Sequence, residues 1–265
     1  RDFPEDDDSR RRAAGDLGLA LCAEGDFAAA AHVHREALEV CRRVLGDEHT
    51  DTLACANNLA MALRASGEHD ESTELYSETY EIMRQVMGDE HPDTLVSAGN
   101  LGMALAAQGQ WADAEELLQE TLDAMRQELG EDHAHTLTIA ENLAGALSAQ
   151  GKDIETIELY EWTLDGYRRL FGAGHPDTLT VASNMSLTLL AQLRNDEAAA
   201  LQRETLDAAR EALGVEHPQF PTYACNLAMS LLARGESAEA TVLLEEALGL
   251  ERRALGVGHP SALAT

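Results

Sequence analysis

The sequence predicts an all-α protein, built as a solenoid of six stacked helical hairpins. Three observations carry this prediction. One phrase recurs every 42 residues, and the apolar residues between its copies follow helical spacing. Ala and Leu, the strongest helix formers, dominate a composition that has only 4% aromatic residues. Hydrophobic residues make up 45% of the chain, which is enough for a continuous core.

The recurring phrase predicts the start of each hairpin. Its first copy reads Leu-Gly-Asp-Glu-His-Thr-Asp-Thr-Leu and ends at Leu53, and most later copies place a proline after the histidine. Proline suits the first position of a helix, and an acidic residue in the first turn complements the helix dipole. The histidines of the six copies are His49, His91, His133, His175, His217 and His259.

Between the phrases, each period contains two helical segments. The first has apolar residues at i and i+4, such as Leu101 and Leu105, and ends near a glycine in every hairpin except one, where Leu193 stands instead. In the second, a small residue such as Ala114 and a large one such as Leu117 recur. We expect the small residue to let a neighbouring helix approach and the large one to fill the gap beside it.

The period sets the predicted boundaries. First helices are expected near 9–24, 51–66, 93–108, 135–150, 177–192 and 219–234, and second helices near 27–45, 69–87, 111–129, 153–171, 195–213 and 237–255. The hairpins therefore span about 9–45, 51–87, 93–129, 135–171, 177–213 and 219–255. Since no linker divides them, residues 1–265 are predicted to form a single domain, with an acidic extension at 1–8 and the start of a truncated seventh hairpin at 259–265.

Charge and composition exclude several classes of partner. The net charge of −29 repels phosphate backbones and anionic lipid, so nucleic acid and membranes are disfavoured. The four cysteines form no C-x-x-C pair, and we expect small buried thiols in a reducing compartment. No signal peptide and no apolar run of ~18 residues is visible, so a cytoplasmic protein is predicted. The chain opens with Arg1 and is expected to be cut from something longer.

A central hairpin carries the residues of a known repeat. Leu101, Gly102, Gly109, Trp111 and Ala114 resemble the tetratricopeptide repeat pattern. The 42-residue period and the Leu-Gly-x-x-His-Pro phrase narrow the resemblance to the long-repeat class of kinesin light chains and of bacterial and fungal regulators of the nucleotide-binding type. This resemblance implies a right-handed α-solenoid superhelix whose first helices line the concave side, where peptides usually bind. It is specific for fold and poorly specific for function.

One polar residue recurs in phase with the core. We call this set the asparagine ladder: Asn58, Asn100, Asn142, Asn184 and Asn226. Asparagine costs a few tenths of a kcal/mol relative to Ala inside a helix, so five copies need a cause. A side-chain amide can pair with the backbone of an extended peptide, and the resemblance implies that role at this position. A structural hydrogen bond between hairpins is the alternative.

The neighbours of the ladder are expected to select the ligand. One turn later come Met61, Met103, Gly145, Leu187 and Met229, and near the other end lie Cys55, Ser97, Ile139, Val181 and Tyr223. Lys and Arg are absent from all these positions, so an apolar or basic ligand is predicted. Core packing is a competing role for Met61, Met103 and Met229. Helix layers ~10 Å apart would give each rung about three residues of an extended ligand, and five rungs would span on the order of a dozen.

Catalysis and metal binding find little support. The phrase histidines recur once per hairpin, and a hydrogen bond to the adjacent hairpin is expected of them rather than a metal site. No phosphate-binding loop or nucleophile elbow is present, so no enzyme and no cofactor are predicted. The acidic residues of the second helices, such as Glu71, Glu74 and Glu78, are interpreted as a solvated outer face, with a basic partner docking there as the lesser alternative.

The sequence therefore predicts a scaffold that binds an extended peptide through the asparagine ladder, Met61, Met103 and Met229. One alternative is the sensor or regulatory array of a larger signalling NTPase or transcription regulator. Another is a structural protein that self-associates through the apolar surface of its unfinished C-terminal end.

Overall fold

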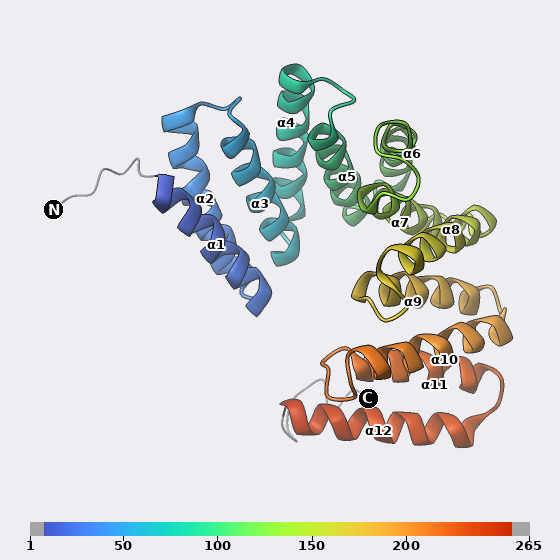
Figure 1. The fold of residues 1–265 in the computed structure, drawn as a ribbon. Coiled ribbons are helices and arrows are strands. Elements are labelled where there is room, and N and C mark those ends of the chain that lie inside the picture. The colour runs from blue at the N-terminus through green and yellow to red at the C-terminus, as the bar shows by residue number, and fades with distance from the viewer. Residues whose placement is uncertain (1–7, 256–265) are drawn as a thin grey trace. The chain divides into compact units, whose positions relative to one another are not determined.

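The structure is a computed structural model that describes residues 8–255, with side chains at 12–250, 252 and 253. The described residues form helices joined by short turns and contain no strand (Figure 1). The helices are α1 (Asp8–Glu24), α2 (Phe27–Leu45), α3 (Thr50–Ser66), α4 (His69–Met87), α5 (Pro92–Ala107), α6 (Trp111–Glu128), α7 (Ala134–Ala149), α8 (Asp153–Phe171), α9 (Pro176–Ala191), α10 (Asn195–Ala212), α11 (Phe220–Ala233) and α12 (Ser237–Leu255). The all-α prediction is confirmed, and every predicted helix bound lies within one residue of the observed bound.

The helices gather into two compact units, residues 1–131 with α1–α6 and residues 132–265 with α7–α12. Within each unit every helix packs against the next one along the chain. First helices of successive hairpins also touch, as α1 touches α3 and α9 touches α11. The single domain over 1–265 stays a prediction. Residues 1–7 of the acidic extension and the proposed seventh hairpin at 259–265 lie outside the described residues.

The histidine of the recurring phrase caps its own helix. His91 Nδ1 accepts a hydrogen bond from the backbone N–H of Asp93 at 3.2 Å, and His175 Nδ1 does the same with Asp177 at 3.3 Å. His49 and His133 repeat this cap two residues onward, whereas His217 accepts its bond from Gln219, the residue just before α11. A cap of this kind satisfies one of the backbone donors left free at a helix start. The predicted hydrogen bond to the adjacent hairpin is therefore wrong for these five histidines; His259 lies outside the described residues.

The turn inside each hairpin requires a left-handed residue. Gly67 ends α3 with φ 89°, and the glycines at this position of the other hairpins also have positive φ. Leu193 occupies the same position between α9 and α10 with φ 61°, and it is the one non-glycine residue of positive φ among the described residues. Its side chain is 81% exposed, so no burial offsets the backbone strain.

Replacing Leu193 with glycine is expected to stabilise the second unit. The left-handed conformation costs a residue with a Cβ about 1–2 kcal/mol, and glycine does not incur that cost. Leu193→Gly should therefore raise the free energy of unfolding by about 1 kcal/mol in urea titrations followed by circular dichroism. Leu193→Ala is the matched control, because it removes the exposed side chain and keeps the Cβ. Equal stabilisation by both variants would show that side-chain exposure, not backbone strain, was the cause.

In three hairpins a close contact joins a small residue of the first helix to a large one 16 positions later. In the third hairpin, a Cβ built on Gly102 would lie 2.6 Å from Leu118 Cγ, and Leu118 is fully buried. Leu117, which the sequence predicts as the gap-filling residue, is only half-buried. The prediction is wrong by one position, because the side of α6 that meets α5 is rotated by one residue from the expected side.

The same offset of 16 positions brings a polar residue of the second helix against the first helix in two other hairpins. Gln202 Nε2 donates to Ser186 Oγ at 3.1 Å between α10 and α9. His34 of α2 packs over Gly18 of α1, and its two ring nitrogens have no hydrogen-bond partner among the described residues. Burial lowers the pKa of His34, so a neutral imidazole occupies this core position.

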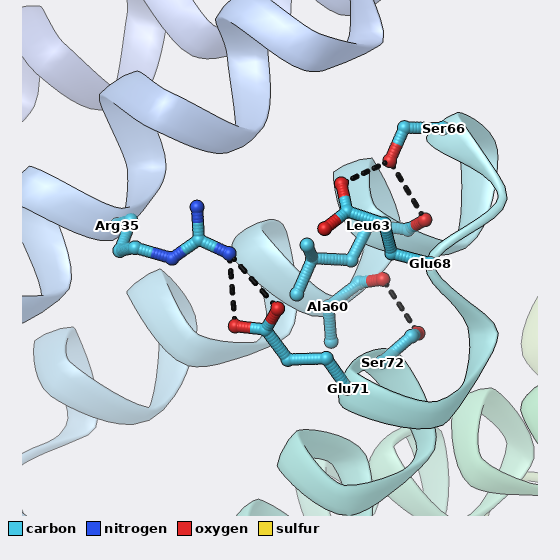
Figure 2. A network of polar contacts seen from close by, with 7 residues as sticks. All are labelled: Arg35, Ala60, Leu63, Ser66, Glu68, Glu71 and Ser72. Carbon is cyan, nitrogen blue, oxygen red and sulfur yellow. Dashed lines mark hydrogen bonds and ion pairs between the residues drawn. The ribbon is translucent and has the colours of Figure 1, made fainter.

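A hydrogen bond also joins the two helices of the second hairpin, and another closes the end of its first helix (Figure 2). Ser72 Oγ of α4 donates to the backbone oxygen of Ala60 in α3 at 2.7 Å, and Ser72 is fully buried. Ser66 Oγ near the end of α3 donates to the Leu63 oxygen at 2.9 Å. Ser72 is one of the small residues that recur on second helices, and here its size and its hydroxyl both serve the contact.

Arginine–glutamate pairs connect the second helices of successive hairpins. In Figure 2, Arg35 of α2 reaches Glu71 of α4, with Nη2 2.8 Å from Oε1. Equivalent pairs recur 36 residues apart in both units: Arg42–Glu78, Arg168–Glu204 and Arg203–Glu239. Glu71 and Glu78 are exposed, as the interpretation of a solvated face requires, and each also pairs with an arginine of the preceding second helix. Because these pairs are exposed, each stabilises the fold by less than about 1 kcal/mol.

Candidate functional site

The asparagine ladder lies at the edge of the buried core in both units. Asn58 and Asn100 are on α3 and α5 of the first unit, and Asn142, Asn184 and Asn226 are on α7, α9 and α11 of the second. All five are half-buried, and each is followed by a buried Leu or Met. Each amide therefore stands where a first helix emerges from the hairpin stack and meets solvent.

Four of the five amides keep their hydrogen-bonding capacity. Asn184 Nδ2 donates to Glu141 Oε1 at 3.4 Å, which joins α9 to α7. The side chains of Asn58, Asn100, Asn142 and Asn226 make no hydrogen bond to another described residue. Asn184 therefore makes a structural hydrogen bond between hairpins, whereas the other four asparagines of the ladder make none to a described residue.

The residues one turn after the ladder also reach the surface. Met61 and Met103 are half-buried, while Leu187 and Met229 are 38% and 44% exposed. Leu232, one turn beyond Met229 on α11, is 49% exposed. The predicted apolar surface beside the ladder is thus present, and it is most exposed on α9 and α11 of the second unit.

On the other side of the ladder the predicted positions are buried. Ser97, Ile139, Val181 and Tyr223 belong to the interior, and Cys55 is half-buried with its Sγ 3.5 Å from Cys41 Sγ of α2. Because four of these residues are buried and Cys55 packs against Cys41, they do not line a ligand surface. The surface positions lie one residue earlier, four before each asparagine: Ala54, Val96, Thr138, Thr180 and Thr222.

One half-buried carboxylate, that of Glu141, stands beside the ladder. Glu141 of α7 is half-buried, accepts the bond from Asn184, and forms no ion pair with a described residue. The pKa of Glu141 is raised to about 7: loss of hydration is the largest cause, repulsion by Asp177 adds to it, and the Asn184 bond opposes both. Its charge also contributes to the raised pKa of Tyr160 and Tyr167, both about 12. Sequence reasoning missed Glu141, because a lone glutamate on a helix shows no sign of its buried surroundings.

The side chains of this face are of the kinds that bind a ligand by hydrogen bonds and apolar contacts. The face offers amides, threonine hydroxyls, apolar side chains and the half-buried carboxylate of Glu141. Among residues 8–255, no group of three or more His, Cys, Asp or Glu side chains could hold a metal ion. Over the same residues, no helix is both long and apolar enough to cross a membrane.

Comparisons with known proteins agree with this geometry. The tetratricopeptide repeat family matches residues 9–85, 52–127, 97–169, 135–211 and 177–250. No curated protein sequence matches the chain at a significant level.

Among solved structures, one comes from Podosopora anserina and is described as a kinesin light chain with nearly identical TPR-like repeats. It is 27% identical over 78% of this chain and 99% of its own, with a TM-score of 0.70. BtubC from P. vanneervenii is 19% identical over 88% of this chain and 94% of its own, with a TM-score of 0.74. The apo form of RapI is 13% identical, with a TM-score of 0.67 over 95% of this chain and 86% of its own, and like BtubC it shows the fold alone. The chain belongs to the tetratricopeptide repeat family and resembles its kinesin light chain-like members.

Proposed function

We propose that this protein is an interaction scaffold that binds an extended segment of another polypeptide along its first helices. The amides of the asparagine ladder would pair with the ligand backbone, and Met61, Met103 and Met229 would contact its side chains. The tetratricopeptide repeat fold is in general a protein-interaction fold, which supports the class of function. The use of this particular face is our proposal.

The observation that carries the proposal is the state of the amides. An amide that has no protein partner and whose polar atoms reach solvent can exchange its bound water for the backbone of a ligand. Asn58, Asn100, Asn142 and Asn226 are all in this state, since they bond to no described residue and none of their polar atoms is fully buried. In the second unit, three rungs ~10 Å apart would serve about nine residues of an extended ligand.

The chemistry of the face also supports an apolar or basic partner. The first helices α7, α9 and α11 contain no Lys or Arg, and the net charge of the chain is −29. Acidic peptides, nucleic acid and anionic membranes would all be repelled.

We propose no catalytic reaction for this face. Two alternatives stay predictions. Self-association would use residues 259–265, which lie outside the described residues. A regulatory array would be part of a larger NTPase.

Removing ladder amides is expected to abolish most peptide binding without unfolding the chain. Peptides would be selected from a random ten-residue phage library on the full 265-residue chain, and the affinity of a selected synthetic peptide would be measured by fluorescence anisotropy. Asn100→Ala, Asn142→Ala and Asn184→Ala together should weaken it by at least about tenfold, because several backbone hydrogen bonds are lost.

Gln119→Ala with Gln127→Ala is the matched control, since both amides are exposed on the second helix α6. These changes should leave the affinity unaltered, and circular dichroism should show native helicity in all variants. Unchanged binding by the folded triple variant would refute recognition by the ladder.

A further inference from the structure

The first helices of the second unit carry two kinds of surface within a short distance. Leu187, Met229 and Leu232 are exposed apolar side chains on the two touching helices α9 and α11. Exposed apolar residues grouped on one face commonly mark a binding surface. Asn184 stands one turn, or about 4.5 Å of helix rise, before Leu187, and it holds Glu141 of the adjacent hairpin at 3.4 Å.

Glu141 is a half-buried carboxylate that forms no ion pair with any described residue. Its neighbours are Asn184 and Asp177 of α9 and the phenols Tyr160 and Tyr167 of α8, and none of them is a cation. A half-buried carboxylate without a cation is unfavourable, and burial together with Asp177 raises its pKa to about 7. A guanidinium or ammonium group arriving from outside would restore the missing charge and would find hydrogen-bond acceptors already in place.

The glutamate at position 141 occurs in one hairpin only, whereas the asparagine of the ladder recurs in five hairpins. At the five equivalent places the chain has Gly15, Asn57, Gly99, Ser183 and Cys225, so only the fourth hairpin offers a carboxylate here. The apolar surface is also restricted: one turn after Leu187 stands Leu190, where the first unit has Arg64 and Ala106. A repeated amide row can hold any backbone, but these unrepeated residues can choose one side-chain pattern and fix its register.

We propose that the face of α7, α9 and α11 binds an extended polypeptide segment that places one Arg or Lys side chain against Glu141 and apolar side chains over Leu187, Met229 and Leu232. The inference rests on the proposed function and names the partner chemistry of that same site. Neighbouring rungs ~10 Å apart correspond to about three residues of extended chain, so the basic and apolar residues of the ligand should be about three positions apart.

The test uses the peptides selected on the full-length chain. They are expected to share a basic residue about three positions from an apolar one. One such peptide and its counterpart with citrulline, the neutral isostere of arginine, would be measured on wild type and on Glu141→Gln in a double-mutant cycle. We expect the citrulline peptide to bind wild type at least about tenfold more weakly and the variant to lose most of that discrimination.

Matched variants separate this contact from general charge effects. Glu158→Gln removes the same charge from an exposed site on α8 and should preserve the discrimination. Leu187→Ser with Met229→Ser should weaken both peptides alike by about tenfold, because the apolar contacts are lost in either case.

The outcomes also separate the two proposals. Loss of binding in the triple asparagine variant, with no coupling between Glu141 and the basic residue, would overturn the present inference and leave the proposed function standing. Selected peptides without a basic residue would overturn it equally. Full binding by the triple asparagine variant would overturn the proposed function itself.

Discussion

Truncating Leu118 to alanine is expected to lower the free energy of unfolding of the first unit by about 3–5 kcal/mol. Leu118 is fully buried, and it lies over Gly102, which has no side chain to move into the space. Leu→Ala substitutions in cores cost about 2–5 kcal/mol, and the cost rises with the volume of the cavity that is left. Facing a glycine, the site has little means of collapse, so the upper part of that range is expected in urea titrations.

Leu117→Ala is the matched control for this experiment. Leu117 is the adjacent residue of α6, and it is only half-buried. Its truncation should cost roughly half as much or less, because less area leaves water on folding. Equal costs for the two variants would mean that the contact between α5 and α6 is not made as described.

A second substitution at the same contact tests its geometry. Gly102→Ala alone would place a Cβ 2.6 Å from Leu118 Cγ, and overpacking of this kind costs about 1–3 kcal/mol. In the Leu118→Ala background the new methyl group has room, and alanine is the better helix former by about 1 kcal/mol. Gly102→Ala should therefore destabilise the wild type and stabilise the truncated variant.

Replacing Glu141 with glutamine is expected to stabilise the second unit by about 3 kcal/mol at pH 8. The pKa of Glu141 is raised to about 7 in the folded chain, from 4.5 without burial. A raised carboxyl pKa means that the unfolded chain ionises more easily, so stability is lost as pH rises through this window. The penalty is absent below pH 4.5, grows between 4.5 and 7, and is complete above 7, where about 2.5 pH units correspond to about 3 kcal/mol.

The measurement compares free energies of unfolding of wild type and variant at two pH values. At pH 5 the gain from Glu141→Gln should be below about 1 kcal/mol, and at pH 8 it should approach its full size. Glu158→Gln, which removes an exposed charge from α8, should give no comparable change between the two conditions. A gain that is the same at both pH values would show that Glu141 is not destabilised by its surroundings.

Much of the fold was predictable because the signals for it are local. A glycine with positive φ ends each first helix except one and recurs every 42 residues, and a proline stands at the first position of α5 and α9. These features act within a few residues, so sequence spacing shows them directly. Even Leu193 follows the rule, since it adopts the left-handed conformation of the glycines that it replaces.

The candidate site was predictable only in part. The asparagine ladder and the methionines lie at the surface of the first helices as their spacing indicates. The sequence predicted that Cys55, Ser97, Ile139, Val181 and Tyr223 line the ligand surface, but four of them are buried and Cys55 is half-buried. Glu141 was not predicted as a site residue. In both cases the deciding neighbour belongs to another hairpin: Cys41 faces Cys55, and Asn184 contacts Glu141 from 43 residues away.

By itself the sequence determined the type, length and order of the helices and the recurrence of one amide per hairpin, because caps, turns and helical period depend on neighbours along the chain. Only the tertiary structure decided which of two adjacent residues is buried, as for Leu117 and Leu118, since successive residues of a helix point about 100° apart and the side toward the next helix is set by packing. It also decided the charge environment of Glu141, because hydration and neighbouring charge depend on distances in space and not on positions in the sequence.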